Sequence, residues 1–428
     1  MMTLQIVVLT VMMFFIVVTV HEWGHYFFAK RAGILVREFA IGFGPKLFSY
    51  KRDETVFTLR LLPLGGYARM AGDDPELDPI QPGQTIAVRL SDEGLVKKIY
   101  LDRLDTRRNV VIGEIEWMDI EERMQIRLNV DGETQHLEVD RKADIVTRGQ
   151  ELQVAPKDRQ FRSKSVGKRA LAIFAGPMMN FVLAFVLFLI YVQVAGVPDE
   201  NATGVKVSSV VAGTPAAAAG LQEGDIVQSI DGQPVDGDLS KVTTLINASG
   251  GQEVQMSVER GGEAVQIPVT PKKVTAEDGR EVLQVGIALG QLKRTASFTE
   301  TFQFAGESFQ KGSTAILDAL RRLVFERFDI NQLAGPVGTL QATGQIASQG
   351  IDQMILWTAL VSINLGIFNL LPIPMLDGSR LIFLAIEAIR RRPIDPNKEG
   401  IVHFVGFALI FLLMIAVTYN DILRIING

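Results

Sequence analysis

Four long apolar runs limit what this chain can fold into more than any other feature of its sequence. A helix needs ~20 mainly apolar residues to cross the roughly 30 Å hydrocarbon core of a bilayer, and each run meets or nearly meets that length. The four runs are Leu4–Val20, Ala170–Val197, Met354–Pro374 and Ile401–Thr418. The first run lacks the basic start and the small-residue cleavage site of a signal peptide, so we expect it to be retained. With a hydrophobic content of 47%, the predicted fold is a multi-pass α-helical membrane protein with four transmembrane helices.

The distribution of charge predicts which segments stay in the cytoplasm. Basic residues exceed acidic ones by seven to three in 26–60, by six to one in 157–169 and by five to three in 380–399. Segment 199–300 instead holds fourteen acidic and eight basic residues. Because positively charged flanks remain inside, we predict that segment 199–350 and both termini lie outside the cytoplasm. The net charge of -5 indicates no nucleic-acid partner.

The stretch after the first run has the pattern of strands. Residues 34–70 alternate in hydrophobicity and are interrupted by glycines, which predicts a hairpin or small sheet packed against the first helix. Such strands can lie at lipid depth only if they pair with one another or line a protein cavity. Residues 76–160 are charged and contain short alternating runs, so we predict a cytoplasmic β-rich insert whose role the sequence does not indicate.

The segment between the second and third runs forms a further soluble unit. It begins with an expected strand at Val205–Val211, continues through a short alanine-rich helix after Pro215, and returns in a strand at Ile226–Ile230. From Ser297 to Glu326 apolar residues recur near helical spacing. We therefore expect an amphipathic helix that joins this unit to the third run.

The segment His21-Glu22-Trp23-Gly24-His25 is the candidate chemical centre. Two histidines four residues apart lie on one helical face, so both imidazoles can reach one Zn²⁺, and Glu22 beside them can accept a proton from the attacking water. Ionisable groups at the end of an apolar run usually face a protein interior or a water-filled cavity. Alternatively, these side chains only extend toward the membrane surface, but that requires neither this spacing nor this order.

A catalytic zinc ion normally takes three protein ligands and keeps one position open. Asp377 is the best candidate for the third ligand. Pro372 and Pro374 break the third run near its cytoplasmic end, which frees backbone groups and lets the chain turn inward. The topology derived from charge places His25 and Asp377 on the same side of the membrane.

Composition limits the other donors. The chain has no cysteine, so disulfides and thiolate metal sites are excluded, and a metal must be bound by His, Asp, Glu or Asn. His136 lies in the charged insert and His403 opens the fourth run, positions that favour structural roles for both.

Together these motifs resemble the site-2 protease family of intramembrane zinc metalloproteases, peptidase family M50. The chain is most similar to the bacterial regulator-of-sigma type with a single PDZ domain, as found in Gram-positive bacteria. The matching elements are His21–His25 for HExxH, Gly176–Asn180 for GPxxN, Asn369–Gly378 for NxxPxPxLDG, and Pro215–Ile226 for a bacterial PDZ domain. One departure is Ser379, where many relatives have a second glycine. The order of the parts matches along the whole chain.

The resemblance implies a role for individual residues. His21, His25 and Asp377 would bind one Zn²⁺ per chain, and Glu22 would be the general base. Residues 39–70 look like the membrane-inserted β-hairpin of the family, whose edge pairs with substrate. The residues implied in substrate binding are Asn364, Asn369, Pro372, Pro374, Gly42, Phe43, Gly65 and Gly66. Asn364 and Asn369 could instead form hydrogen bonds between helices, and Asn180 could equally serve helix packing.

The implied function is that of an intramembrane zinc metalloprotease acting in regulated intramembrane proteolysis and stress response. Its substrates would be single-span membrane proteins already trimmed outside, notably anti-sigma factors and remnant signal peptides. The enzyme would lie in the bacterial plasma membrane, with its active site near the cytoplasmic side and its PDZ domain outside. That domain would bind peptide C-termini by strand addition or would only filter substrates by size.

Two other functions were weighed against this one. A catalytically silent PDZ-containing membrane scaffold would be expected to lose a member of the metal set, yet all of its members are present. A zinc transporter would need more than one membrane-depth ligand cluster with ionisable residues in several spans, and the second and fourth spans offer no such cluster. The predicted domain order has six parts. Residues 1–75 hold the first transmembrane helix with HExxH and the membrane-associated sheet, 76–160 the cytoplasmic insert, and 165–198 the second transmembrane helix. Residues 199–292 form the PDZ domain, 293–350 the amphipathic linker, and 351–428 the third and fourth transmembrane helices with the LDG motif.

Overall fold

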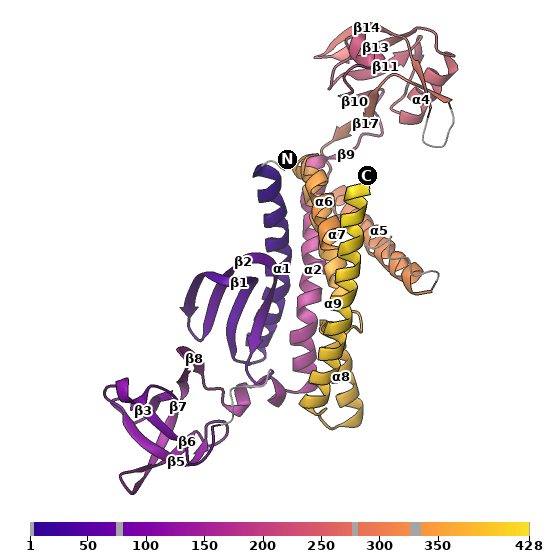
Figure 1. Cartoon of the computed structure of the whole chain (residues 1–428). Helices are drawn as coiled ribbons and strands as arrows, with labels where there is room; N and C mark the ends of the chain where they lie inside the picture. Colours follow the sequence, from indigo (N-terminus) through magenta and orange to yellow (C-terminus); the bar gives the residue numbers. More distant parts are fainter. Residues whose placement is uncertain (1–3, 74–79, 276–280, 326–334, 428) are drawn as a thin grey trace. The chain divides into compact units, whose positions relative to one another are not determined.

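The computed structural model describes residues 4–73, 80–275, 281–325 and 335–427. The chain forms two compact units, one made of Leu189–Ala305 and the other of the remaining sequence on both sides of it (Figure 1). Each unit is described by itself.

The larger unit contains helices that are long and apolar enough to cross a membrane. Within the described residues there are four such segments: Leu4–Arg31 in α1, Val166–Ala195 in α2, Ile351–Asn369 in α7 and Lys398–Leu423 within α9 (Pro396–Asn427). They agree with the four runs seen in the sequence. The predicted ends were too late in two cases, because α2 stops at Ala195 and α7 stops at Asn369, before Pro372 and Pro374. Proline lacks the backbone N–H needed to extend a helix and restrains the residue before it.

Further helices pack against these segments. Helix α6 (Pro336–Ala347) contacts α1, α7 and α9, and α8 (Asp377–Arg390) follows α7 after a short non-helical turn. Helix α5 (Phe298–Phe325) matches the expected amphipathic helix, and its Phe309 ring meets the rings of Phe181 and Phe185 on α2 edge to face. Helix α9 keeps most of its large apolar side chains exposed, as suits contact with lipid.

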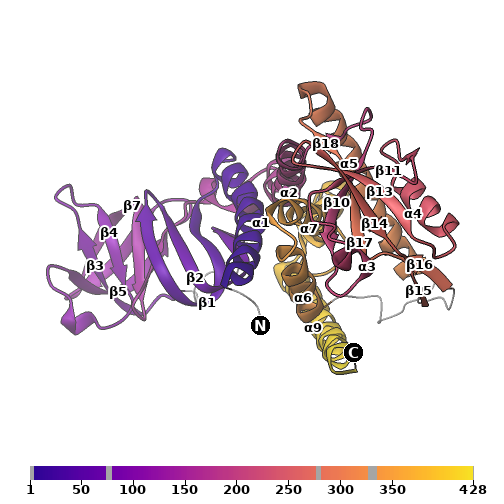
Figure 2. The same cartoon turned by 90° about the horizontal axis from the view of Figure 1, so that it is seen from above.

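A sheet made from two long bent strands packs against α1, as Figures 1 and 2 both show. Strand β1 (Val36–Arg52) begins by pairing with the end of β2 (Thr55–Met70) on one side and with the start of β2 on the other, so that Phe39 faces both Ala68 and Phe57. The second half of β1 then pairs with the start of β2, from Phe48 with Leu59 to Arg52 with Thr55 at the hairpin turn. Residues 66–70 therefore form an edge of this sheet, with no further strand beside them in the described part of the chain.

The insert forms a separate β-sheet with its own core. Its six strands lie in the order β4-β3-β5-β6-β7-β8, and β7 also pairs in parallel with β4. The core gathers side chains such as Ile86, Ile99 and Leu128, all fully buried. The bounds are Thr85–Leu90 for β3, Val96–Tyr100 for β4, Val111–Asp119 for β5, Gln125–Val130 for β6, Glu133–Thr147 for β7 and Gln150–Gln153 for β8, with single 3₁₀ turns at Leu104–Thr106, Lys157–Arg159 and Phe161–Ser163. The expected β-rich content is confirmed.

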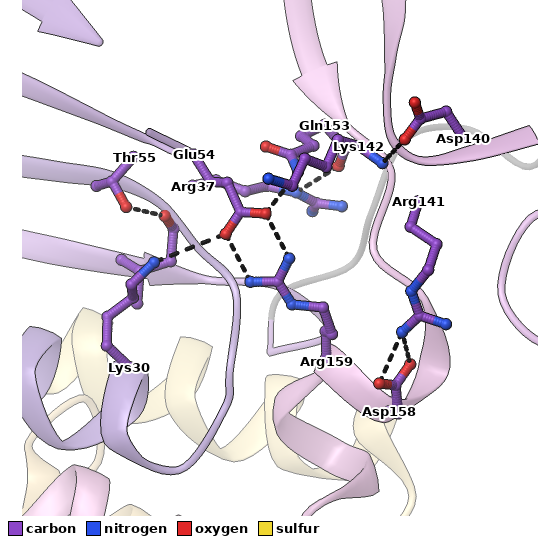
Figure 3. Close-up of polar contacts among 11 residues, drawn as sticks. Lys30, Arg37, Glu54, Thr55, Asp140, Arg141, Lys142, Gln153, Asp158 and Arg159 are labelled. Atoms are coloured by element: carbon purple, nitrogen blue, oxygen red, sulfur yellow. Dashed lines mark hydrogen bonds and ion pairs between the residues drawn. The ribbon is translucent and has the colours of Figure 1, made fainter. Parts of the chain in front are cut away.

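Polar contacts join the insert to the hairpin turn (Figure 3). The carboxylate of Glu54 accepts two hydrogen bonds from Arg159, at 2.5 and 2.7 Å, and one from Gln153 at 3.3 Å, while Lys30 at the end of α1 lies 3.7 Å away. Arg37 donates from Nε to the carbonyl of Gln153 at 3.0 Å. The hydrogen bond from Arg159 lowers the pKa of Glu54 to about 2. The first helix, the hairpin and the insert thus meet at one partly buried carboxylate.

In its described residues the smaller unit contains a six-stranded sheet, two two-stranded sheets formed by β15 with β16 and by β9 with β18, and the short helices α3 and α4. The strands of the six-stranded sheet lie in the order β14-β13-β11-β10-β17, with β12 paired to β11, and the predicted strand, helix and strand are present as β10, α3 and β11. Buried Asp225 accepts hydrogen bonds from Arg260 at 2.7 Å, which lowers the pKa of this carboxyl. The bounds are Val197–Pro198 for β9, Val205–Val210 for β10, Pro215–Ala218 for α3, Ile226–Ile230 for β11, Gln233–Pro234 for β12, Leu239–Ala248 for α4, Val254–Arg260 for β13, Glu263–Val269 for β14, Lys272–Thr275 for β15, Glu281–Gln284 for β16, Ile287–Gln291 for β17 and Lys293–Arg294 for β18.

Candidate metal centre

The two histidines of α1 point to one side of the helix and are buried. His21 and His25 are 7% and 8% exposed, and their rings meet edge to face with centroids 4.8 Å apart. The Nε2 atoms of the two rings are 3.3 Å apart. Two ring nitrogens at this distance share one small space, as expected for neighbouring ligands of one ion.

The first residue of α8 completes this group. Oδ2 of Asp377 lies 3.3 Å from Nε2 of His21 and 3.4 Å from Nε2 of His25. The three donor atoms therefore form a nearly equilateral triangle. Tetrahedral zinc with bonds of about 2.0–2.1 Å places its ligand atoms about 3.3–3.4 Å apart. The spacing and the nitrogen and oxygen donors fit zinc, and the structure brings together the three residues that the sequence singled out.

The Asp377 oxygen that faces the histidines contacts no hydrogen-bond donor other than their rings in the described part of the chain. Oδ2 is buried and has no hydrogen-bond partner among the described residues. A buried, unpartnered carboxylate oxygen is costly unless a cation neutralises it. Within the described residues, His21, His25 and Asp377 are also the one group of His, Asp or Glu whose donor atoms converge closely enough to hold a metal.

A strained turn places Asp377 at the start of α8. Met375 has a φ of 78°, unusual for a residue with a side chain, and its N–H donates to Nδ1 of His403 on α9 at 3.0 Å. A Cβ on Gly378 would lie 2.3 Å from two carbonyl oxygens of the preceding turn, and one on Gly406 would lie 2.0 Å from Pro374. His403 therefore has the structural role expected for it, but its contact with this turn was not predicted.

Helix α2 supports the histidines from behind. Nδ1–H of His25 donates to the carbonyl of Ala172 at 2.9 Å, which leaves Nε2 with its lone pair toward Asp377. A Cβ on Gly176 would lie 2.2 Å from Nε2 of His25, so only glycine fits there. Nδ1 of His21 lies 3.2 Å from the amide of Asn180, which is fully buried. Sequence reasoning noted the motif of Gly176 and Asn180 but did not connect it to the histidines.

Glu22 lies beside the metal group and next to the sheet edge. Its side chain is 8% exposed, and a Cβ on Gly66 would lie 2.9 Å from Cγ of Glu22. A cavity of about 800 Å³ opens onto His21, Glu22, His25 and Asp377. Its walls include residues 66–70 of β2 and Asn369. A carboxylate, a metal-type donor set and an exposed strand edge thus share one cavity.

The other residues predicted to bind substrate lie elsewhere. Asn364 lines a separate, mainly apolar cavity of about 530 Å³ between α5 and α7. Five more of these residues do not line the larger cavity. Gly42, Phe43 and Gly65 belong to the hairpin, where Gly65 packs on the Phe43 ring, and Pro372 and Pro374 belong to the turn before α8. The ion pair of Arg380 and Asp73 at the wall of the larger cavity was not predicted.

Comparison with known proteins agrees with this geometry. Residues 9–413 match the sequence description of peptidase family M50. The chain is 44% identical to "Zinc metalloprotease RasP" of Oceanobacillus iheyensis, over 98% of this chain and 99% of that one. It is 40% identical to "Regulator of sigma-W protease RasP" of Bacillus subtilis, over 98% of both chains.

Part of the chain is also similar to solved structures. The PDZ domain of an SdrC-like protein from Listeria monocytogenes is 26% identical over 21% of this chain and 88% of that chain, with a TM-score of 0.18. The assignment rests on the full-length matches and the converging donor atoms. The chain belongs to peptidase family M50 and is a zinc metalloprotease of that family.

Proposed function

We propose that His21, His25 and Asp377 bind the zinc ion, that Glu22 is the general base, and that the reaction is hydrolysis of a peptide bond at membrane depth. The observation that carries this proposal is the triangle of donor atoms with sides of 3.3, 3.3 and 3.4 Å, closed by an aspartate oxygen that has no other partner. The two histidines belong to a helix apolar enough to span a bilayer, which supports cleavage within the membrane.

The residues around the triangle have separate tasks in this reaction. Zinc, when bound, supplies Lewis-acid chemistry, since it lowers the pKa of a water ligand toward ~7 and polarises a carbonyl. Glu22 accepts the proton of the attacking water and passes it to the leaving amine. Its position beside Gly66 puts this proton transfer next to the edge of the sheet.

Substrate binding uses the edge formed by residues 66–70. A transmembrane helix hides its carbonyls in its own hydrogen bonds, so a substrate must unwind before hydrolysis. An unwound segment can regain backbone hydrogen bonds by pairing with a free strand edge. Residues 66–70 line the cavity that contains Glu22, and Asn369 faces the same cavity, which supports pairing of the substrate there. Asn364 in the neighbouring apolar cavity would contact the part of the substrate that stays in lipid.

The substrate class is single-span membrane proteins whose outer part has been removed, with anti-sigma factors and remnant signal peptides as members. A relative named as a regulator of sigma-W protease supports the first of these. The excess of basic residues near the ends of α1 and α8 supports an active site on the cytoplasmic side of a bacterial plasma membrane, with residues 199–292 outside as a PDZ-type size filter or peptide binder. Membership of a peptidase family and a complete donor set disfavour the silent scaffold.

The test is cleavage of a single-span model substrate in detergent or liposomes by the wild type, Glu22→Gln and Glu93→Gln, with zinc measured in each protein. We expect Glu22→Gln to keep zinc and lose cleavage. Glu93 is exposed in the insert, so the same substitution there should leave cleavage unchanged. Equal cleavage by Glu22→Gln and the wild type would overturn the assigned role. Unchanged zinc content in His21→Ala or Asp377→Ala would overturn the ligand set.

A further inference from the structure

One face of α2 supplies support to both histidines at helical spacing. Ala172, Gly176 and Asn180 follow one another at four-residue intervals, so they lie in one stripe along the helix. The Ala172 carbonyl accepts the Nδ1–H of His25, Gly176 leaves room for the same ring, and the Asn180 amide meets Nδ1 of His21. The Ala172 carbonyl requires the proton of His25 to be on Nδ1. The same question, which ring nitrogen carries the proton, arises for His21.

Ligation through Nε2 decides where the proton of His21 must be. A neutral imidazole carries one proton, so a ring that offers its Nε2 lone pair to a metal carries the proton on Nδ1. That Nδ1–H is buried with the ring and needs a hydrogen-bond acceptor. The atom 3.2 Å away is Nδ2 of the Asn180 side-chain amide, so the amide as placed presents its NH₂ group, not its oxygen, to this ring.

The amide of Asn180 can provide that acceptor. The oxygen and nitrogen of an asparagine amide exchange places when the group rotates by half a turn, with almost no change of shape. Oδ1 of Asn180 has no hydrogen-bond partner elsewhere in the described residues, so no competing donor holds it away from His21. The position is fully buried, which excludes bulk water as the acceptor in its place.

We propose that Asn180 is a positioning residue whose Oδ1 accepts the Nδ1–H of His21 and thereby holds that ring with Nε2 toward the zinc position. This rests on the proposed function only in that His21 ligates through Nε2. Asn180 touches neither substrate nor metal. Partners of this kind usually change metal affinity by about 10–100-fold when they are removed.

A purely structural role for Asn180 makes a different prediction. Its backbone carbonyl accepts a hydrogen bond from Oγ of Ser362 on α7 at 2.8 Å, and both residues are fully buried, so this layer also joins two helices. If only packing mattered, an apolar side chain of similar size would serve, and a buried carboxylate would be worse. If His21 needs an acceptor, a carboxylate at this position should preserve zinc binding better than an apolar side chain does.

The experiment compares zinc retention of the full-length protein in detergent against a graded series of competing chelator. The variants are Asn180→Leu, which has similar volume but no acceptor, Asn180→Asp, which keeps an acceptor oxygen, and Ser362→Ala, which removes the interhelical hydrogen bond and leaves the amide. We expect Asn180→Leu to bind zinc 10–100-fold more weakly than wild type, and Asn180→Asp and Ser362→Ala to stay within a few-fold of it.

Two results would overturn the proposal. One is wild-type zinc affinity in Asn180→Leu, and the other is an affinity of Asn180→Asp as low as that of Asn180→Leu. His21→Ala is measured beside them, because zinc binding that survives this change would instead overturn the ligand set. Thermal unfolding of each variant shows whether the compared proteins are folded, and Asn180→Asp carries the test if Asn180→Leu is not.

Discussion

Gly176→Ala tests the proposed metal centre at its tightest contact. The added methyl carbon would lie 2.2 Å from Nε2 of His25, 2.5 Å from Cε1 and 2.9 Å from Cδ2. Non-bonded heavy atoms pack at roughly 3.5–4.0 Å, so the ring must move by more than ~1 Å or α2 must retreat by as much. A retreat of α2 would break the hydrogen bond from His25 to the Ala172 carbonyl, so both responses displace the same ligand.

A displacement of this size is large for a zinc ligand. Functional zinc sites hold their bond lengths within about 0.2 Å, so His25 cannot both avoid the methyl group and keep its bond. We expect zinc affinity to fall by about 100-fold or more, equivalent to ~3 kcal/mol. Cleavage should fall at least as much, since a misplacement of ~1 Å alone can cost ~10²-fold in rate.

The assay measures zinc content after dialysis and cleavage of a single-span substrate, for Gly176→Ala and Gly167→Ala. Gly167 lies on the same helix with nothing within 4 Å of its added methyl group, so the control changes only helix propensity. We expect the control to retain zinc and activity and to be slightly more stable. If Gly176→Ala retained zinc and cleaved substrate as well as Gly167→Ala, His25 could not be a ligand in the position described.

Two further predictions concern the surroundings of the site. Because the pKa of Glu54 is lowered to about 2, the folded state holds fewer protons there than the unfolded chain, so this contribution to stability is complete above pH ~4.3 and is lost as pH falls toward 2. Unfolding followed between pH 6 and 3 should therefore show a smaller loss of stability in Glu54→Gln than in wild type, and parallel curves would contradict the assignment. His403→Ala should weaken zinc binding a few-fold, because it removes the acceptor that anchors the exposed Met375 N–H beside the Asp377 turn. His403→Asn, whose Oδ1 can replace Nδ1 as acceptor, should restore most of that affinity, and equal losses in both variants would show that no acceptor is needed.

Much of the fold could be predicted because its signals are local. The apolar runs, the strands of the insert and the order of strand, helix and strand from Val205 to Ile230 all follow from hydrophobic period and turn residues. The proximity of Asp377 to the α1 histidines could be predicted from the distribution of charge, because that distribution predicts that the ends of two distant helices lie on one side of the membrane. The ends of α2 and α7 were predicted too late, because hydropathy alone does not indicate the residue at which a helix stops.

The supporting residues could not be found in this way. Ala172 acts through a backbone carbonyl, which no side-chain pattern reveals, and the role of Gly176 depends on how α2 is rotated against α1. The pairing of β1 with both halves of β2 likewise depends on where each long strand bends, and two long alternating segments do not define that register.

The position of the sheet edge connects the insert to the chemistry. Helix α1 carries His21, Glu22 and His25 in its second half and ends at Lys30 and Arg31, near the hairpin turn. The same hairpin passes Glu22 at Gly66 and contacts the insert at Glu54, through Arg159 and Gln153. Gly66 leaves less than one methyl group of space beside Glu22, so the hairpin packs directly against this side chain. The polar contacts at Glu54 join this hairpin to the insert, so the strand that passes Glu22 and the insert are held by one connected set of contacts.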